Sequence, residues 1–324
     1  INLCGTGGPA NLNFDSGQLF DPGTLGYLTC PAGSAGAGQT ILVGTPYVGN
    51  VITTINPVAQ RVLDTDPFPE PNRDDFYNFI NTDPRTRNDD LFDARIDHTL
   101  GPNDRLMGRY FLGDSKTISP VGGFTSLPSF REKYIFRGHN LALSWTRNFG
   151  PTLLNEARFG FQRESSSVLC GECPREEGFM AGFGIENLSA FGPEFEGYPL
   201  FGISNFSSVG DSPYRPSVYP DMVEKFQDNL TWVHGKHTFV VGGDLQFWQV
   251  LRMTVPRSVY GNIGVDGRYY SLASEIPDVS LVSGFADFLA GYPSSGDHSA
   301  RFQPNYFVGG GFWSFYAQDD YKIS

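Results

Sequence analysis

The chain has 324 residues, with 35 acidic and 23 basic side chains and a formal net charge of -12. This balance argues against a nucleic-acid partner, because binding to phosphates needs a basic surface. Aromatic residues make up 15% and charged residues only 18% of the chain, which excludes a disordered composition and fits an all-β protein of secreted or outer-membrane type.

Residues 1–89 have no long strand pattern and are rich in Gly, Pro, Asn and Thr. One short helix is predicted from Asn56 to Leu63, with Pro57 at the first helical position, where its missing N–H costs nothing. The segment is therefore interpreted as loop-rich, either an extracellular loop or the junction between a plug and a barrel. Because the chain starts at Ile1 without a signal-type segment and stops inside a hairpin pattern, we interpret it as an internal fragment.

The stretch from Asp90 to Asp114 predicts one long β-hairpin, because apolar and charged side chains alternate with the period of two that a strand requires. The apolar face consists of Phe92, Ala94, Ile96, His98 and Leu100 before a turn at 101–104, and of Leu106, Gly108, Tyr110 and Leu112 after it. These faces match only if paired residue numbers sum to an even number, so the loop holds an odd number of residues, and three fits. Asp97 then lies opposite or diagonal to Arg109 or Arg105.

Two further hairpins repeat this pattern. The second has Leu141, Leu143, Trp145 and Phe149, a turn at 150–152, and then Leu153, Ala157, Phe159 and Phe161. The third has Phe226, Leu230 and Trp232, a turn at His234–Gly235, and then Phe239, Val241, Leu245 and Phe247. A final arm from Phe312 to the last residue has no predicted partner.

The arms are too long for an ordinary soluble sheet. Each can run for about ten residues, enough to cross a bilayer when tilted, whereas the average strand has about five or six. No apolar run approaches the roughly 18 residues of a membrane-spanning helix, so only strands could cross.

The connections between the arms are asymmetric. They are short at 101–104, 150–152 and 234–236, and long at about 115–136, 165–222 and 253–311. Outer-membrane barrels have short periplasmic turns and long extracellular loops. The aromatic residues predicted near strand ends, as in the girdles of such barrels, are Trp145, Phe149, Trp232, Trp313 and Tyr321. We therefore expect residues 90–324 to form an all-β, antiparallel transmembrane β-barrel fragment of about seven or eight strands.

Four cysteines are present, and none falls on a predicted strand: Cys4, Cys30, Cys170 and Cys173. Nearest-neighbour pairing, Cys4 with Cys30 and Cys170 with Cys173, would form two loop disulfides in an oxidising compartment. Cys170 and Cys173 have the spacing of a redox dithiol or half a metal site, but their Gly/Pro/Glu loop favours the disulfide.

Three other motifs are interpreted as structural. Gly33–Thr40 has the glycine spacing of a phosphate loop, but Gln39 stands where lysine is needed. His234 and His237 flank a turn without a nearby third ligand in the sequence. The acidic run 64–75 lacks the spacing of a calcium-binding EF-hand loop and is interpreted as solvated.

The charged side chains on the polar face of the strands are the better candidates for function. In a barrel they would line the lumen, and they are Asp93, Arg95, Asp97, Arg109, Glu156, Arg158, Glu164 and Asp244. The alternative is a ladder of cross-strand pairs without any contact to a transported solute. No catalytic residue, cofactor or metal ligand is predicted. A secreted β-sandwich adhesin or carbohydrate-binding module, and an extracellular hydrolase, remain as other function classes.

Several segments resemble the strand motifs of TonB-dependent outer-membrane receptors, in particular the Oar-like branch with an N-terminal carboxypeptidase-regulatory-like domain. They are NDDLFDARIDHTLGPNDRLMGRY, LLNEARFGFQRE, FQDNLTWVHGKHTFVVGGDLQFWQ, ADFLAGYPSS and FYAQDDYKIS. INPVAQRVLD, residues 55–64, resembles a segment that precedes the barrel strands in the same group.

This resemblance implies energised transport of a large solute across the outer membrane of a Gram-negative bacterium. It implies contact with outer-membrane lipid, and energy from the TonB, ExbB and ExbD complex, which would act through a TonB box that this stretch does not contain. A plug domain, also expected elsewhere, would close the barrel. The ligand is a siderophore, an oligosaccharide or a peptide, and the direction, import or export, is open.

Overall fold

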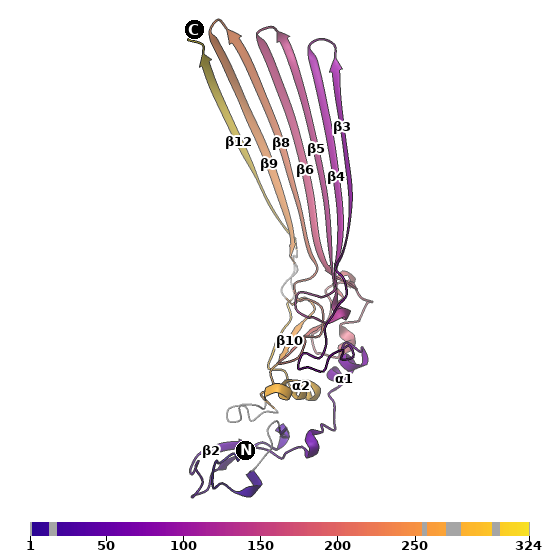
Figure 1. Cartoon of the computed structure of the whole chain (residues 1–324), viewed down its shortest axis with the longest axis vertical. Coiled ribbons are helices and arrows are strands. Elements are labelled where there is room, and N and C mark those ends of the chain that lie inside the picture. The colour runs from indigo at the N-terminus through magenta and orange to yellow at the C-terminus, as the bar shows by residue number, and fades with distance from the viewer. Residues whose placement is uncertain (1, 13–17, 255–257, 270–279, 300–304, 324) are drawn as a thin grey trace.

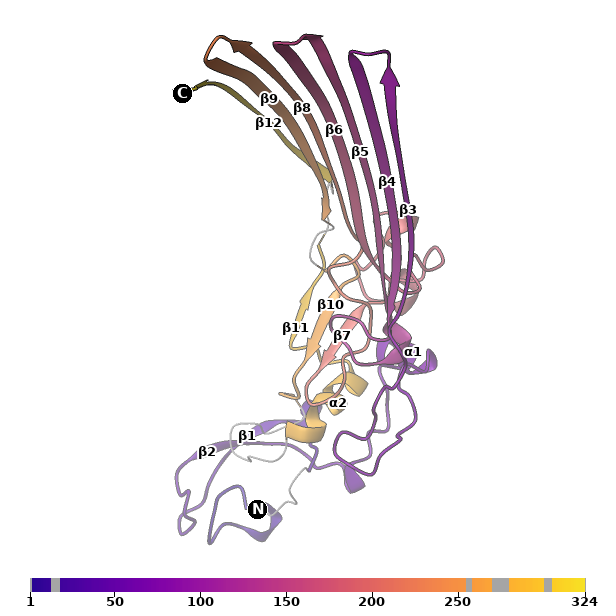
Figure 2. The ribbon, with the colours of Figure 1, turned by 45° about the horizontal axis from the view of Figure 1, so that its top comes forward.

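The computed structural model describes residues 2–12, 18–254, 258–269, 280–299 and 305–323. Long strands form one curved sheet, and the short helices and small strands gather at one end of it (Figure 1 and Figure 2). In the described part of the chain, neither α-helix is long and apolar enough to cross a lipid bilayer.

Within the described residues the large sheet has seven strands, in the order β12-β9-β8-β6-β5-β4-β3, and every neighbouring pair is antiparallel. The strands are β3 (Thr86–Leu100), β4 (Asp104–Ser119), β5 (Glu132–Gly150), β6 (Leu153–Cys170), β8 (Ser217–His234), β9 (His237–Thr254) and β12 (Asn305–Tyr321). They have between 15 and 19 residues, so each is longer than a bilayer crossing requires. The predicted all-β antiparallel fold is confirmed.

The register gives the sheet two chemically different faces. One row crosses all seven strands through apolar or small residues and runs Ile96, Gly108, Leu143, Phe159, Phe226, Leu245 and Trp313. The adjacent row on the other face runs Arg95, Arg109, Ala142, Gly160, Lys225, Gln246 and Phe312. We call these the apolar face and the polar face. Each predicted hairpin places its alternating residues on these faces as expected.

The three hairpin turns are short. Leu100 pairs with Asp104, so the first loop holds three residues, as the parity of the pattern predicted. His234 pairs with His237, which leaves a two-residue turn. Gly101 and Gly235 adopt φ values of 73° and 60°, in the left-handed region that glycine enters without strain.

The connections at the opposite end fold together into a body that we call the cap, made of residues 51–69, 120–131, 171–216 and the described parts of 258–299. It contains α1 (Pro57–Asp64), α2 (Ser280–Ala290), β7 (Leu200–Ile203), β10 (Asn262–Val265), β11 (Ser295–Asp297), and the 3-10 turns η4 (Pro128–Phe130), η5 (Ala181–Phe183) and η6 (Pro193–Phe195). β10 pairs with β7 in parallel and with β11 antiparallel.

The cap has its own hydrophobic core. Its buried members come from three connections and from α1, and they are Ala59, Val62, Leu127, Phe130, Phe183, Tyr198, Phe201, Ile203, Val209, Val265 and Phe288. The helix predicted at Asn56–Leu63 is α1. The Oδ1 atom of Asn56 accepts the Val58 N–H at 2.9 Å as an N-cap, and Ala59 and Val62 face the core.

The N-terminal segment is small and separately cross-linked. It contains η1 (Ala10–Leu12), η2 (Pro22–Thr24), the hairpin β1 (Gly26–Thr29) with β2 (Thr40–Val43), and η3 (Val48–Asn50). Cys4 and Cys30 form a disulfide that packs on Ile41.

Several predictions about the strand ends were wrong. The strands continue into the predicted loops, so Cys170 is the last residue of β6 and not a loop residue. The final arm begins at Asn305 instead of Phe312 and pairs with β9. Trp313 therefore lies in the middle of β12, opposite Leu245, and not near a strand end.

The segment ADFLAGYPSS, interpreted as a strand motif, is also different. Its first five residues, Ala286–Ala290, end α2, and only Ser295 belongs to a strand. The apolar residues Phe285, Phe288 and Leu289 contact the cap core, and this helical spacing explains why the segment is not extended.

Candidate functional site

All eight predicted lumen residues lie on the polar face. Asp93, Arg95 and Asp97 alternate along β3, and Arg109 is the direct partner of Arg95 on β4. Glu156, Arg158 and Glu164 share the parity of Gly160 on β6, and Asp244 shares that of Gln246 on β9, which places them in the same surface. Polar side chains from four strands are thus gathered on one continuous surface.

On β3 and β4 the charges pair with each other. A guanidinium nitrogen of Arg109 lies 2.5 Å from a carboxylate oxygen of Asp93, and Arg95 lies 2.7 Å from Asp97 on its own strand. Met107 is the residue opposite Asp97, so Asp97 is diagonal to both Arg105 and Arg109, as one of the predicted arrangements had it. The ion pair that Asp97 makes is nevertheless with Arg95.

A second group of pairs lies on β6, β8 and β9. Arg158 contacts Glu156 at 2.7 Å, and the ammonium of Lys225 lies 3.6 Å from Asp244. The Ser314 hydroxyl on β12 donates to Asp244 at 3.1 Å. Asp244 thus connects three neighbouring strands through side-chain contacts.

Glu164 is different from the other seven residues. Its partner across the β6–β8 pair is Asp221, so two carboxylates stand opposite each other near the cap end of the polar face. Among the described residues no ion pair reaches either of them. Sequence reasoning missed Asp221 because it assigned this residue to a loop, and the irregular pattern from Asp221 to Lys225 gives no local strand signal.

The polar face can therefore hold water and a hydrated solute through hydrogen bonds. Like charges directly opposite each other repel. Glu164 and Asp221 therefore create a negative potential at the cap end of the polar face, whereas the charges nearer the turns are neutralised in ion pairs. Both original interpretations, a cross-strand ladder and a solute-binding surface, are compatible with this geometry.

The cap contains a pocket of about 220 Å³ between α1, α2, β7 and β10. Its walls are mostly apolar and include Phe201 and Val265. Asp287 is fully buried beside it and accepts the Tyr269 N–H at 3.1 Å. Tyr292 also lines the pocket, and its ring stacks on that of Tyr269, with 5.2 Å between the ring centres. Apolar walls with a few fixed polar groups are typical of ligand pockets, but a volume of about 220 Å³ is below the roughly 300–1,000 Å³ of sites for drug-sized ligands, so this pocket fits only a small group.

A close approach at this pocket explains one glycine. Gly291 follows α2 with φ at 77°, and a Cβ atom there would lie 2.3 Å from the side-chain amide nitrogen of Asn56. The backbone N–H of Asn56 donates to the Leu289 carbonyl at 2.7 Å. The start of α1 and the end of α2 are therefore held together at the pocket wall.

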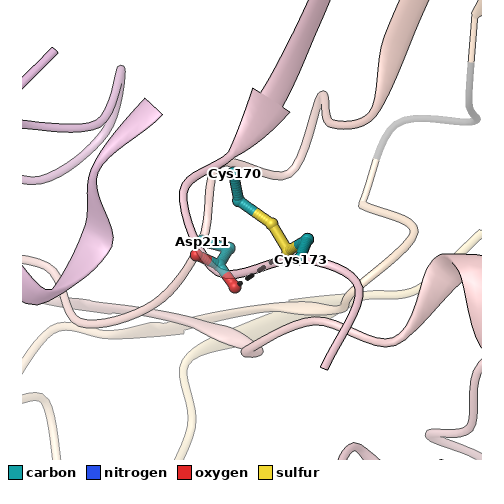
Figure 3. A group of neighbouring side chains, drawn as sticks. All are labelled: Cys170, Cys173 and Asp211. Carbon is teal, nitrogen blue, oxygen red and sulfur yellow. Dashed lines mark hydrogen bonds between the residues drawn. A yellow bond between two sulfur atoms is a disulfide. The ribbon is translucent and has the colours of Figure 1, made fainter. Parts of the chain in front are cut away.

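The Cys170–Cys173 disulfide lies where β6 enters the cap (Figure 3). The Sγ atom of Cys173 is 3.5 Å from Oδ2 of Asp211. A disulfide sulfur carries no proton, so this is a van der Waals contact and not a donated hydrogen bond. Within the described ranges, Cys170, Cys173 and Asp211 are the one group with the composition of a metal site. While the two sulfurs are bonded to each other they are not thiolates, so the group does not fit a metal ion.

Asp211 is buried, and its charge is balanced by the protein. It accepts the Tyr198 N–H at 2.8 Å, and Arg175 lies 3.5 Å away. Burial raises the pKa of Asp211, and the Arg175 guanidinium opposes that shift. Arg175 also lies over the rings of Phe179 and Tyr198, which favours its position in the cap.

A second buried carboxylate joins the cap to the sheet. Glu132, the first residue of β5, is 2% exposed and lies 3.1 Å from Arg215, just before β8. The Tyr134 hydroxyl donates to the same carboxylate at 2.7 Å. A buried ion pair keeps its geometry when further hydrogen bonds satisfy it, as here.

The remaining motifs have structural environments. His237 contacts Asp319 at 2.8 Å across the β9–β12 pair and belongs to the turn end. Gly33–Thr40 connects β1 to β2. In the acidic run, Asp75 contacts Arg73 at 3.1 Å on the surface.

Comparison with known proteins gives one match. The family described as "Outer membrane beta barrel domain" matches residues 10–324. No curated protein and no solved structure matches the chain significantly. The match covers the sheet and the cap together, and it agrees with long antiparallel strands that have one apolar face. The chain therefore belongs to the outer membrane beta barrel domain family, and its place is the outer membrane of a Gram-negative bacterium.

Proposed function

We propose that this chain is the ligand-binding part of a TonB-dependent outer-membrane transporter of the Oar-like type. The cap would bind a large solute, and the polar face would line its route through the completed barrel. The main support is that the connections at one end of the strands fold into a cap with its own core, next to a charged sheet face.

The polar face supports the second half of this proposal. Lumen-facing surfaces of outer-membrane barrels are polar, and lipid-facing surfaces are apolar. A solute crossing the barrel from the cap would first meet the carboxylates of Glu164 and Asp221, which no ion pair reaches in the described part of the chain. It would then meet the paired charges on β3, β4, β6, β8 and β9.

The energised step is inferred from the resemblance of the strand motifs to TonB-dependent receptors. In that mechanism the inner-membrane TonB, ExbB and ExbD complex acts on a box and a plug that belong to other parts of the receptor. Siderophores, oligosaccharides and peptides are the ligand classes to test, in either direction of transport.

We also propose that the protein binds its solute without catalysing a reaction. The charged residues pair with one another along the strands instead of converging on a cleft. A secreted β-sandwich would require a second sheet packed on the apolar face, and in the described residues Ile96, Phe226 and Leu245 of that face are exposed instead. Hydrolysis of a glycan or peptide by the purified receptor would contradict the binding role.

A thiol-labelling experiment on the intact receptor tests the orientation. The four cysteines of this chain are in disulfides, and cysteines in other parts of the receptor are replaced, so a single introduced thiol is the reactive group. In outer-membrane vesicles, Asp93→Cys and Asp244→Cys are expected to react with a water-soluble maleimide, whereas Phe92→Cys and Leu245→Cys are expected to be protected by lipid. Equal labelling of both faces would refute the lumen assignment.

Transport is tested by uptake in cells of the native host. Radiolabelled ferrichrome, maltoheptaose and a casein peptide digest are offered to wild type, a receptor deletion, and a strain without TonB. The proposal expects uptake of one probe class to fall equally in both mutants. Uptake that depends on the receptor but not on TonB would refute the energised mechanism and leave a passive channel.

A further inference from the structure

The disulfide between Cys170 and Cys173 has a buried carboxylate beside it. Figure 3 shows the carboxylate of Asp211, which comes from a later part of the same connection, directed at Cys173. One ligand atom from each of the three residues lies within 4.8 Å of the other two. Cys170 is 1% and Asp211 2% exposed, whereas Cys173 is partly exposed, so an ion from solvent reaches the group on the side of Cys173.

The residue types and their spacing become those of a zinc site once the disulfide is reduced. Two cysteines separated by two residues are a usual ligand pair for Zn²⁺, and a carboxylate is another of its ligands. With Zn–S of about 2.3 Å and Zn–O of about 2.0 Å, tetrahedral coordination places a sulfur and an oxygen ligand roughly 3.5 Å apart. The Sγ atom of Cys173 and Oδ2 of Asp211 are 3.5 Å apart. This edge of the tetrahedron is therefore already present.

Reduction converts the two sulfurs into ligands. A dithiol transfers two electrons to the Cys170–Cys173 bond and becomes a cyclic disulfide, and its two protons go to the cysteine sulfurs. Binding of Zn²⁺ then releases these two protons to solvent, because thiolates are the ligands. Two sulfur ligands of one tetrahedral ion are roughly 3.8 Å apart, so the sulfurs separate by rotation of the two side chains about their Cα–Cβ bonds.

The charges around the group match a divalent ion. Two thiolates and the Asp211 carboxylate carry three negative charges, of which Zn²⁺ balances two. The guanidinium of Arg175, whose Nε atom lies 3.5 Å from Oδ2 of Asp211, balances the third. The other carboxylate partner of Arg175 is Glu172, whose side chain is 67% exposed and remains in water. The buried group is therefore neutral as a whole when the ion is bound, which keeps the cost of burying its charges low.

Neighbouring groups hold the ligands in place. The backbone N–H of Tyr198 donates to Oδ2 of Asp211 at 2.8 Å, which fixes the carboxylate. The hydroxyl of Tyr260 lies 3.8 Å from Sγ of Cys170, within reach for a hydrogen bond to a thiolate. Metal ligands in proteins are oriented by outer hydrogen bonds of this kind. The carboxylate and one sulfur are therefore positioned before an ion arrives.

We propose that Cys170 and Cys173, when reduced, bind a thiophilic divalent ion of the Zn²⁺ type together with Asp211, with water as the fourth ligand. The two cysteines then have two alternative states, a disulfide and a metal site, and oxidation of the sulfurs releases the ion. Cys170 ends β6 and Asp211 lies shortly before β8, so the ion links the beginning and the end of the 171–216 connection. The proposal does not depend on which solute the receptor transports.

The experiment uses the intact receptor in detergent micelles, with Cys4→Ser and Cys30→Ser and with cysteines in other parts of the receptor replaced. The protein is reduced with a dithiol, which is then removed under nitrogen, and is titrated with Cd²⁺, whose bonds to thiolates absorb in the ultraviolet. The cadmium–thiolate band is expected to saturate at one Cd²⁺ per chain and to disappear when Zn²⁺ is added in competition. The oxidised receptor is expected to show no band.

Asp211→Asn distinguishes this site from a simple pair of thiols. It removes the carboxylate ligand, keeps the shape of the side chain, and is expected to bind Cd²⁺ at least about tenfold more weakly, since even changes in the outer shell of a metal site cost about 10–100-fold. Glu172→Gln removes the exposed carboxylate between the two cysteines and is the matched control, expected to bind like the wild type. Equal binding by Asp211→Asn and Glu172→Gln would overturn the proposal and leave chelation by the two thiols alone.

A second measurement does not depend on the folding of the Asp211 variant. X-ray absorption at the zinc edge of the reduced, zinc-loaded receptor with Asp211 in place is expected to show two sulfur ligands at about 2.3 Å and oxygen ligands at about 2.0 Å. Four sulfur ligands, which would come from two receptor molecules, would overturn the proposal. A shell of oxygen ligands alone, or no zinc bound to the reduced receptor, would overturn it as well.

Discussion

The sheet and the cap bury their apolar residues in opposite ways. In the sheet, Ile96 is 72% and Phe315 77% exposed, although both lie on the apolar face. In the cap, Val62 and Val209 are fully buried among the other members of its core. The two regions are folded for different solvents: lipid must cover the first, whereas water surrounds the second.

This difference also separates the forces that hold each region together. The sheet depends on backbone pairing between successive strands, which every hairpin provides locally. The cap depends on contacts between segments far apart in the chain, such as the hydrogen bond between Thr65 and Tyr198 at 2.8 Å. Mutations should therefore act on one region without disturbing the other.

The largest effect is expected in the cap core. Phe201→Ala leaves a cavity beside Phe183 and Phe288 and should destabilise the cap by about 3–5 kcal/mol. The check is the denaturant midpoint of a cap-specific signal, such as protease resistance of the loops in intact vesicles. Phe76→Ala, at an exposed ring, is the control and should leave that midpoint unchanged. Loss of membrane insertion in the Phe201 variant would mean that the two regions fold as one unit.

The next effect concerns the apolar face. Phe226→Arg places a charge in the lipid-facing band and removes the contact with Phe159, whose ring centre is 4.8 Å away. A lipid-facing arginine near the bilayer midplane costs about 2–4 kcal/mol, so the free energy of unfolding, measured by urea denaturation from vesicles, should fall by at least that amount. Gln227→Arg, one residue further on the polar face and beside Asp244, should be tolerated. If Gln227→Arg lowers the free energy of unfolding more than Phe226→Arg does, the polar face is the one in contact with lipid and the assignment is wrong.

A smaller effect is expected from pH in the cap. Burial raises the pKa of Tyr198 to about 12 from its ordinary value of 10.0. Because the folded pKa is raised, this contribution to stability is complete below pH 10 and is lost as the pH rises from 10 through 12, with a magnitude of about 2–3 kcal/mol. Cap stability in Tyr198→Phe should therefore fall less between pH 10 and 12, and the part of the fall that remains comes from Tyr260, whose pKa burial also raises. A parallel pH profile in both proteins would show that another group titrates.

The smallest effect is expected on the polar face. Glu156→Gln removes one partner of an exposed ion pair and should change unfolding stability by about 0–1 kcal/mol. If the polar face lines a transport route, uptake of the identified solute should change more than stability does. No change in either quantity would favour the ladder of cross-strand pairs.

The sheet was predictable because its signals are local. Alternation from Phe92 to Leu112 defines both arms and their faces, and the turn at 101–103 defines the register. The same logic placed the polar residues, since a strand that exposes Leu143 on one side must expose Ser144 on the other. What failed was the extent of each strand, because the patterns become irregular beyond the apolar band.

The cap was not predictable from such patterns. β7 and β10 are short and pair in parallel across a long stretch of chain, so neither has a neighbouring arm to define its register. Tyr198 and Phe130 come from different connections and meet only in the folded state. Two local signals were present: the one for α1 was interpreted correctly, and the apolar spacing of α2 was assigned to a strand instead.

The Glu132–Arg215 pair also determines how the cap is attached to the sheet. Glu132 is the register partner of Cys170, where the chain leaves β6, and it also binds Arg215, where the chain approaches β8. The connection therefore begins and ends beside the same residue of β5. Both ends of the 171–216 connection are thus held at the cap end of the sheet, through the Cys170–Glu132 register pair and the Glu132–Arg215 ion pair. The connection from 171 to 216 is therefore attached to β5 as well as to β6 and β8.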